Sequence, residues 1–174
     1  MHMPDARYPI GPFKYRPRHS QEERLQYIAR IEALPAFVRQ AVSGMDDELL
    51  DRSYREGGWT VRQLLHHLPD SHMNGYIRFK LALTEDSPTI KPYDEQQWSA
   101  LPDVFAVPVD VSLSLLEALH VRWTAVLRSM KDADFSRTYL HPEHGRLFSL
   151  DEALQSYAWH GEHHHAHVRA ALGA

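Results

Sequence analysis

Hydrophobic residues recur every three or four positions in four stretches of the chain, a spacing that is typical of amphipathic helices. The first stretch begins with Ser20 and Glu23, which form a capping box and predict a helix start. Pro35 lies within this stretch, so we expect the helix to kink or divide there. The positions that roughly keep the helical spacing are Leu25, Ile28, Leu34, Val38 and Val42.

The second stretch predicts a helix over about residues 60–84. Thr60 and Gln63 form another capping box at its start, and Pro69 is expected to interrupt it. One stripe at about 100° per residue carries most of the hydrophobic side chains and one histidine. Its members are Val61, Leu64, Leu65, Leu68, His72, Tyr76, Phe79 and Leu83.

Two further helices are predicted in the C-terminal half. The third covers about residues 110–131, and a turn or short hairpin follows at 138–149. Ser149 and Glu152 are then expected to cap a fourth helix, with an acidic side chain in the first turn, as the helix dipole prefers. This helix is predicted to run to about residue 172.

The segments between these helices show no clear period. Residues 1–19 predict an ordered arm without regular structure, and residues 43–58 predict a link that ends in two glycines. Residues 85–109 hold four prolines and predict a long loop, which in a compact domain is usually functional or a lid. Four amphipathic helices with almost no alternating pattern predict an all-α, up-and-down four-helix bundle, a single domain over residues 1–174.

Composition narrows the class of protein. The chain has 174 residues, a net charge of −4 and no cysteine. The negative charge argues against a nucleic-acid-binding protein, no apolar run approaches the roughly 18 residues of a membrane span, and the N-terminus lacks the pattern of a signal peptide. We therefore expect a cytoplasmic protein in which nitrogen and oxygen ligands hold any metal.

Histidines are concentrated near the C-terminus, where WHGEHHHAH at 159–167 contains five of the 13 in the chain. Because the run is interrupted and the chain continues beyond it, it is not a purification tag. Two of these histidines are one turn apart and share a helical stripe with hydrophobic positions, and such a pair can clamp one metal ion. The stripe comprises Leu150, Ala153, Tyr157, His160, His164, Val168 and Ala171.

A third ligand has to come from another helix, because a catalytic zinc-type site uses three protein ligands and one open position. The segment LLHHLPDSH offers His66, His67, Asp70 and His72. His72 lies on the apolar stripe and His67 lies at its edge, so the periodicity does not separate these two. His141 and His144 could form a second site, although exposed histidines in a turn are expected there.

Three stretches of the sequence resemble one known family. GGWTVRQLLHHLPDSHMNGYIRFKLALTED, PTIKPYDEQQW and YAWHGEHHHAH are similar to the YfiT-like metal-dependent hydrolases of the DinB-like superfamily, and the similarity covers nearly the whole chain. The resemblance implies one divalent metal ion, zinc or nickel, held by His67, His160 and His164 in a cytoplasmic homodimer. Pro69 stands where the family has alanine, which puts the orientation of His67 in question.

The resemblance is compatible with two reactions. A metal held by three neutral imidazoles acidifies a bound water or thiol, so we expect a hydrolase or, as in the bacillithiol-type S-transferases that this branch resembles, an enzyme that transfers a small thiol. Hydrolysis generally needs a general base as well, and no carboxylate is clearly placed for it; Asp70, Asp94 and Glu143 are candidates. This absence favours thiol transfer. The alternative is a non-catalytic metal-binding or stress-response module.

Four residues are candidates for binding a small-molecule substrate. Asn74 and Arg78 follow His67 at helical spacing and could bind a carboxylate of the substrate or of a low-molecular-weight thiol. Tyr93 and Trp98 lie in the long loop and could line a substrate pocket. The sequence names neither the substrate nor a catalytic residue.

Overall fold

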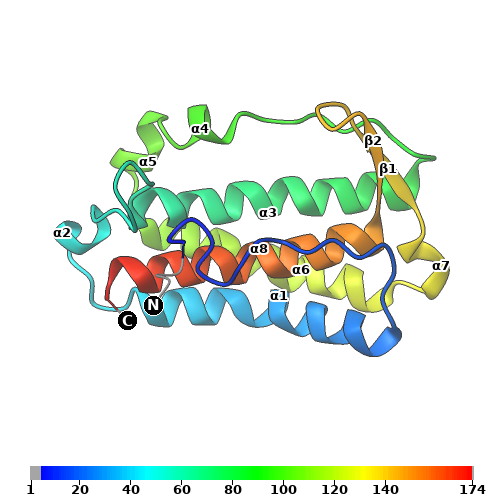
Figure 1. Ribbon diagram of the computed structural model, residues 1–174, viewed down its shortest axis with the longest axis horizontal. Helices are drawn as coiled ribbons and strands as arrows, with labels where there is room; N and C mark the ends of the chain where they lie inside the picture. The colour runs from blue at the N-terminus through cyan, green and yellow to red at the C-terminus, as the bar shows by residue number, and fades with distance from the viewer. Residues whose placement is uncertain (1–4, 174) are drawn as a thin grey trace.

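Four long helices form the body of the protein in the computed structural model, which describes residues 5–173 (Figure 1). They are α1 (Gln21–Ala41), α3 (Val61–Thr84), α6 (Val109–Ser129) and α8 (Leu150–Ala171). Both predicted capping boxes are present, because the side chains of Ser20 and Thr60 each accept a hydrogen bond from the backbone three residues on, and their backbone N–H groups donate to the side chains of Glu23 and Gln63. The predicted four-helix bundle is therefore confirmed.

The helices do not alternate in direction, so the up-and-down order predicted for the bundle is wrong. Side-chain hydrogen bonds join His66 to Ser112 and His72 to His120, so residue numbers rise together along α3 and α6 and these helices are parallel. Helix α1 packs between α6 and α8, and α3 packs against the same two helices from the other side. Helices α3 and α6 are parallel because the connection after α3 returns along the bundle to the end where α3 began (Figure 1).

The connecting segments contain short elements that the sequence pattern did not indicate. They are α2 (Asp47–Leu50), α4 (Glu95–Trp98), α5 (Pro102–Ala106) and α7 (Asp132–Phe135). The segments predicted as a link and as a long loop are thus partly helical. A one-turn helix is too short to show a period, and its start depends on a local cap such as the Asp46 and Asp94 carboxylates, which accept from the backbone of α2 and α4.

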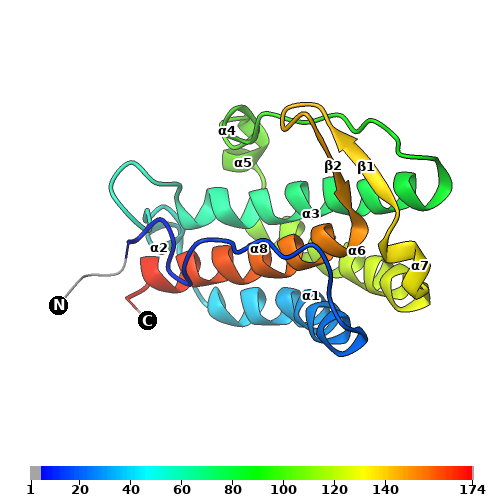
Figure 2. The ribbon, with the colours of Figure 1, turned by 45° about the vertical axis from the view of Figure 1, so that its right-hand side comes forward.

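The predicted hairpin is present and lies beside the long loop. It consists of β1 (Thr138–His141) and β2 (Arg146–Ser149), which pair antiparallel with Thr138 opposite Ser149. The loop adds backbone hydrogen bonds to β1 through Pro88, Ile90 and Leu140. Loop and hairpin therefore lie together on one side of the bundle, where they adjoin α3 and α8 (Figure 2).

Neither internal proline divides its helix: the interruption predicted at Pro69 is wrong, and of the two outcomes predicted at Pro35, a kink or a division, the division does not occur. Both prolines are buried in the bundle, and α1 and α3 each continue through them. A proline removes one N–H and frees the carbonyl four residues earlier. In α1 that carbonyl is Ile31 O, and it accepts a hydrogen bond from His120 Nδ1 of α6 at 2.5 Å. A side chain thus replaces the missing backbone donor.

Residues 5–19 form the expected arm without regular structure and run along α8 (Figure 1). The Gln155 amide binds the arm twice, through the backbone of Lys14 and of Arg16. Asp151 accepts from the backbone of His19 and pairs with Arg24 of α1. These bonds fix the arm to the helix that carries the histidine run. Residues 1–4 of the predicted arm lie outside the described part of the chain.

The hydrophobic core has two parts with histidines between them. A leucine-rich cluster includes Leu64, Leu68 and Leu116, and an aromatic cluster includes Phe79 and Trp123. Along α3, the buried His72 comes between these two groups in sequence, and along α8 the buried His163, His164 and His167 do so. Within residues 5–173, no single helix is long and apolar enough to cross a membrane, although the bent pair Glu95–Ala106 and Val109–Ser129 passes on length and composition.

Candidate metal centre

The antiparallel packing of α3 against α8 brings three histidines together. His160 and His164 are one turn apart on α8, and His67 of α3 faces them. The Nε2 atoms of His67 and His160 are 3.2 Å apart. One candidate ligand atom from each of the three residues lies within 4.8 Å of the other two. The structure thus brings together the three residues that the family resemblance implied as ligands.

This geometry fits a divalent ion. Zinc–nitrogen bonds of about 2.0–2.1 Å at a tetrahedral angle place two nitrogens roughly 3.3 Å apart, close to the separation of the His67 and His160 atoms. Burial lowers the pKa of His67 to about 4 and holds the pKa values of His160 and His164 well below their usual range. All three rings are therefore neutral near pH 7, the form that offers a nitrogen lone pair to a metal.

The other ligand candidates of α3 have different partners. His66 Nδ1 lies 2.7 Å from the Ser112 hydroxyl. His72 faces His120 on one side and His160 on the other, so it stands behind a candidate ligand and outside the cluster itself. Periodicity left open the choice between His67 and His72; packing places His67 in the cluster and His72 behind it, and Pro69 does not keep His67 out of the cluster.

An indole covers the cluster from the side of the 43–60 segment. The ring centroid of Trp59 lies 4.7 Å from that of His67 and 6.3 Å from that of His164. Trp59 Nε1 donates to Gln96 Oε1 of α4 at 3.1 Å, which fixes the indole. An apolar ring beside the imidazoles reduces access of bulk water and lowers the local dielectric.

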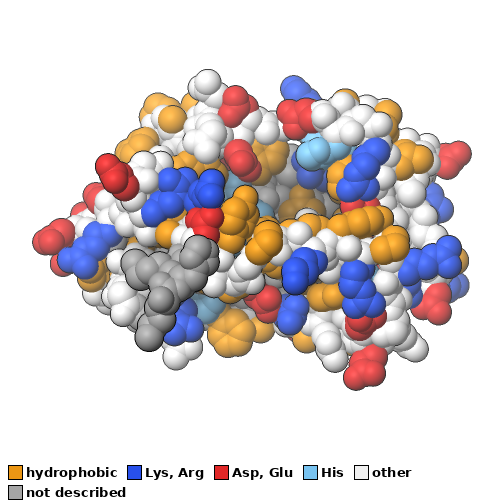
Figure 3. Space-filling view, viewed as in Figure 1, with side chains coloured by type: hydrophobic (Ala, Val, Ile, Leu, Met, Phe, Trp, Pro, Cys, Tyr) orange, Lys and Arg blue, Asp and Glu red, His pale blue; other side chains and the backbone are white. Residues whose placement is uncertain are grey.

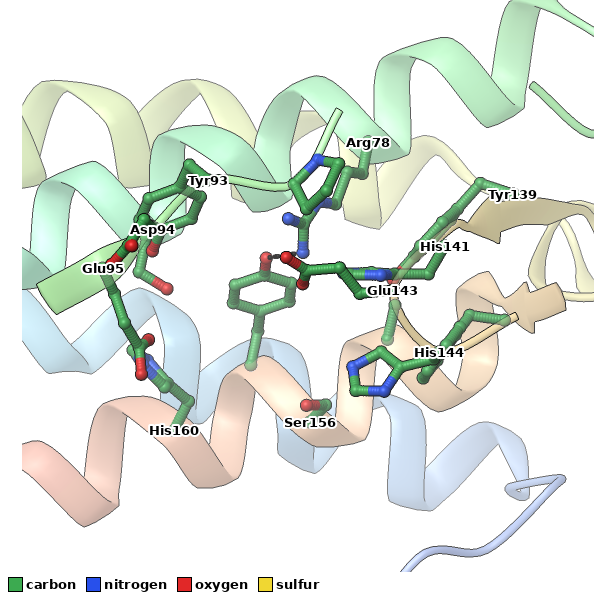
Figure 4. Close-up of a pocket in the computed structure, with 15 residues that line it drawn as sticks. Arg78, Tyr93, Asp94, Glu95, Tyr139, His141, Glu143, His144, Ser156 and His160 are labelled. Atoms are coloured by element: carbon green, nitrogen blue, oxygen red, sulfur yellow. Dashed lines mark hydrogen bonds between the residues drawn. The ribbon is translucent and has the colours of Figure 1, made fainter. Parts of the chain in front are cut away.

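A cavity of about 520 Å³ opens onto the histidine cluster. Its walls come from α3, α8, the long loop and the hairpin, and His160 lies at one end (Figure 4). On the outside of the protein this face is hollowed near its middle, with histidine side chains at the rim and inside (Figure 3). The volume lies within the usual range for small-molecule sites.

Two of the four predicted substrate residues line this cavity, namely Arg78 and Tyr93 (Figure 4). Trp98 packs on Tyr93 with ring centroids 4.6 Å apart and does not itself line the cavity. The Asn74 amide donates to the backbone oxygen of Asp70, one turn earlier in α3, and also lies outside the cavity lining. Trp98 therefore packs against another residue of the loop, and Asn74 forms a hydrogen bond within its own helix.

Arg78 carries a positive charge into the cavity. Its guanidinium donates to the Tyr157 hydroxyl at 3.1 Å, and its Nε is buried without a partner. Within residues 5–173, no carboxylate lies within 4 Å of the guanidinium. Tyr157 in turn lies 6.2 Å from His160, measured between ring centroids. An anionic group bound by Arg78 would thus lie close to the histidine cluster.

Glu95 is a site residue that the sequence reasoning missed. It lines the main cavity together with His160 and a second cavity of about 310 Å³ together with His164. Its carboxylate points towards His160 in Figure 4. Burial raises the pKa of Glu95, with smaller contributions from neighbouring acids. Its position at the start of the one-turn helix α4, inside an aperiodic loop, gave no indication of this role.

The three carboxylates considered from the sequence have different positions. Asp94 and Glu143 line the main cavity, whereas Asp70 does not. The Asp94 side chain accepts from the backbone of Gln97 and so caps α4. Burial raises the pKa of Asp70 to about 6.

The hairpin histidines also line the main cavity. His141 and His144 lie with ring centroids 4.5 Å apart. His144 is exposed as expected, but His141 is buried, because the hairpin folds back against α3 and the long loop. The expectation of an exposed turn is therefore wrong for His141. Among residues 5–173, the pair belongs to no group of three potential metal ligands.

Comparisons with known proteins agree with this geometry. The model of the DinB superfamily matches residues 30–168. The chain is 51% identical over 161 residues to "Putative metal-dependent hydrolase YfiT" of Bacillus subtilis, covering 92% of this chain and 90% of that protein. It is 52% identical over 166 residues to a Bacillus mycoides protein of the same description, covering 95% of each.

Solved structures support the same relationship. The structure of Bacillus subtilis YfiT, described as a probable metal-dependent hydrolase with an unusual four-helix bundle topology, matches with a TM-score of 0.93 at 49% identity and covers 95% of both chains. A mycothiol-dependent maleylpyruvate isomerase shares the fold alone, with a TM-score of 0.60 at 19% identity over 80% of this chain and 60% of that one. The chain therefore belongs to the DinB superfamily and, within it, to the YfiT-like proteins named as metal-dependent hydrolases.

Proposed function

We propose that this protein hydrolyses a small ester or amide that bears a carboxylate, using one zinc or nickel ion held by His67, His160 and His164. The observation that carries the proposal is the position of Glu95, which shares one cavity with His160 and another with His164. A carboxylate beside a three-histidine cluster supplies the general base that the sequence alone did not reveal.

The three histidines act by staying neutral. Since burial keeps their pKa values low, they bring no charge of their own to the site. When bound there, a divalent ion supplies Lewis acidity, which acidifies a water or thiol and polarises a carbonyl. Trp59 covers one side of the cluster and leaves the approach from the cavity open.

Glu95 is proposed to accept the proton of the attacking water. Burial raises the pKa of this carboxyl, which makes it a stronger base than an exposed glutamate. After attack, the same group can return the proton to the leaving alcohol or amine.

Arg78 is proposed to bind the substrate carboxylate. Its guanidinium lines the cavity, and its only hydrogen bond among the described residues is the one to Tyr157. A guanidinium can bind a carboxylate with two parallel hydrogen bonds, which fixes the orientation of the substrate as well as its position. The bond to Tyr157 orients the guanidinium with respect to His160, one turn further along α8.

Glu95→Gln tests this function. We expect turnover of ester or amide substrates to fall by about 10²–10⁴-fold while the metal content is unchanged. Glu143→Gln is the matched control, because Glu143 lines the same cavity from the hairpin. Equal turnover by the parent and Glu95→Gln would contradict the role of the base.

The competing functions give different results in the same assays. Transfer of a small thiol needs no general base, so that activity would appear only with an added thiol and would survive Glu95→Gln. A non-catalytic metal-binding module would bind the ion and show neither activity. The homodimer and the cytoplasmic location expected from the resemblance stay predictions.

A further inference from the structure

A row of histidines crosses the bundle behind the candidate metal centre. His160 Nδ1 of α8 lies 3.2 Å from His72 Nε2 of α3. His72 Nδ1 lies 2.9 Å from His120 Nε2 of α6, and His120 Nδ1 lies 2.5 Å from Ile31 O of α1. All four long helices contribute one member to this row.

The hydrogen bonds in the row have a defined direction. A carbonyl oxygen only accepts, so His120 Nδ1 carries a proton and its Nε2 is left with a lone pair. That lone pair accepts from His72 Nδ1, which leaves a lone pair on His72 Nε2. His72 Nε2 accepts from His160 Nδ1 in the same way. The Nε2 of His160 is then unprotonated, and it is this atom that faces His67 Nε2.

The row begins at a carbonyl that a proline has freed. Ile31 O has no helical partner in α1, because Pro35, four residues on, lacks an N–H. At a position without proline, that carbonyl would already have a backbone donor. Pro35 thereby creates the acceptor that orients His120, and the orientation is passed to His72 and His160.

Burial keeps competing water away from the two middle rings. His72 is 0% exposed and His120 is 2% exposed. The rings are stacked, with centroids 4.9 Å apart, and Trp123 packs edge-on against both. Each ring nitrogen of this pair has a protein partner, as buried polar atoms require.

We propose that His72 and His120 are positioning residues of the metal centre. They hold His160 in the tautomer that presents an unprotonated Nε2 to the ion, and they use Ile31 O as the fixed end of the row. This inference depends on the proposed function, because it takes His160 as a metal ligand. A partner that fixes the tautomer of a metal-binding histidine raises metal affinity, since the ligand is ready before the ion arrives.

The first test reads the tautomers directly in metal-free protein. Nitrogen NMR of labelled histidine distinguishes a ring protonated at Nδ1 from one protonated at Nε2. We expect the Nδ1–H form for His160, His72 and His120. A proton on Nε2 of His160 in the parent protein would overturn the proposal. This readout needs no bound metal, so its result is independent of whether the proposed function is correct.

The second test separates positioning from simple packing. His120→Leu should weaken zinc binding about 10–100-fold in calorimetric titration, with His160 losing its single tautomer. It also leaves Ile31 O and His72 Nδ1 without a partner and lowers the melting temperature. Adding Pro35→Ala restores a backbone N–H for Ile31 O, so the double variant should recover part of the lost stability but still bind zinc weakly.

Rescue by a side chain of similar chemistry completes the test. His120→Gln offers one amide donor for Ile31 O and one acceptor for His72, so its zinc affinity should stay close to that of the parent. Recovery of both stability and parental affinity in the double variant would show that His120 only packs the core. If the parent itself bound no zinc or nickel, the proposed function would fail while the NMR result would still stand.

Discussion

Acidifying the metal-free protein should destabilise it, because the core histidines are folded in their neutral form. Burial lowers the pKa of His67 to about 4 and that of His120 to about 4, whereas a histidine in an unfolded chain titrates near about 6.5. Between these values, the unfolded chain binds protons that the folded protein does not. The free energy of unfolding therefore falls as the pH drops below about 6.5 and is unaffected by these groups above it.

The size of the effect follows from the two pKa differences. At about 1.36 kcal/mol for each pKa unit, each histidine costs about 2 kcal/mol at pH 5 relative to pH 7.5, so together they cost about 4 kcal/mol. Asp70 takes up a proton in the same interval, since burial raises its pKa to about 6. Its side chain is only partly buried, so it offsets less than about 1 kcal/mol. The net loss from these three groups, about 3 kcal/mol, is a large share of a typical domain's stability.

Urea denaturation of chelator-treated protein between about pH 7.5 and 5 measures this loss. His120→Gln removes one of the titrating histidines, so the fall in stability should become shallower by about 1.36 kcal/mol per pH unit. A free energy of unfolding that stays constant over this range would refute the conclusion that neutral histidines fill the core.

Three further predictions concern stability. When the free metal concentration is 100 times the Kd, removing the metal with a chelator should lower the free energy of unfolding by about 2.7 kcal/mol and the melting temperature by about 5–10 °C, measured by calorimetry. An unchanged melting temperature would argue against a bound ion. Gly75→Ala would place a Cβ 2.5 Å from Tyr157 Cζ and 2.7 Å from Trp123 Cη2, so urea denaturation should show a loss of about 1–3 kcal/mol. Asp151→Asn should cost about 3 kcal/mol by the same assay, because it breaks the buried pair with Arg24, and a neutral outcome would mean that the pair contributes little.

The four helices were predictable because each buries one stripe of its surface. Helical spacing and the capping boxes at Ser20 and Thr60 placed the first two starts within a residue of the structure. The direction of α6 was not predictable. Residues 85–108 could extend over roughly 80 Å, more than twice the roughly 36 Å length of α3, so the loop can deliver the next helix to either end of the bundle.

The site was predictable only in part. The helical wheel selected His160 and His164, because two imidazoles one turn apart among core positions need partners. The wheel could not choose His67, since the choice depends on how α3 rotates against α8. His120 was missed although it lies on the apolar stripe of α6, and a polar ring there was a usable indication. Glu95 gave none, because its position depends on how an aperiodic loop folds over the cluster.

Elemental analysis of untagged protein, beside His160→Ala and His165→Ala, tests the central claim most directly. His165 is the matched control, since it lies on the same helix but stacks against Phe37, away from the cluster. We expect about one divalent metal ion per chain in the parent and in His165→Ala, and none in His160→Ala. A parent protein that holds no metal after incubation with zinc and nickel would contradict the three-histidine metal centre.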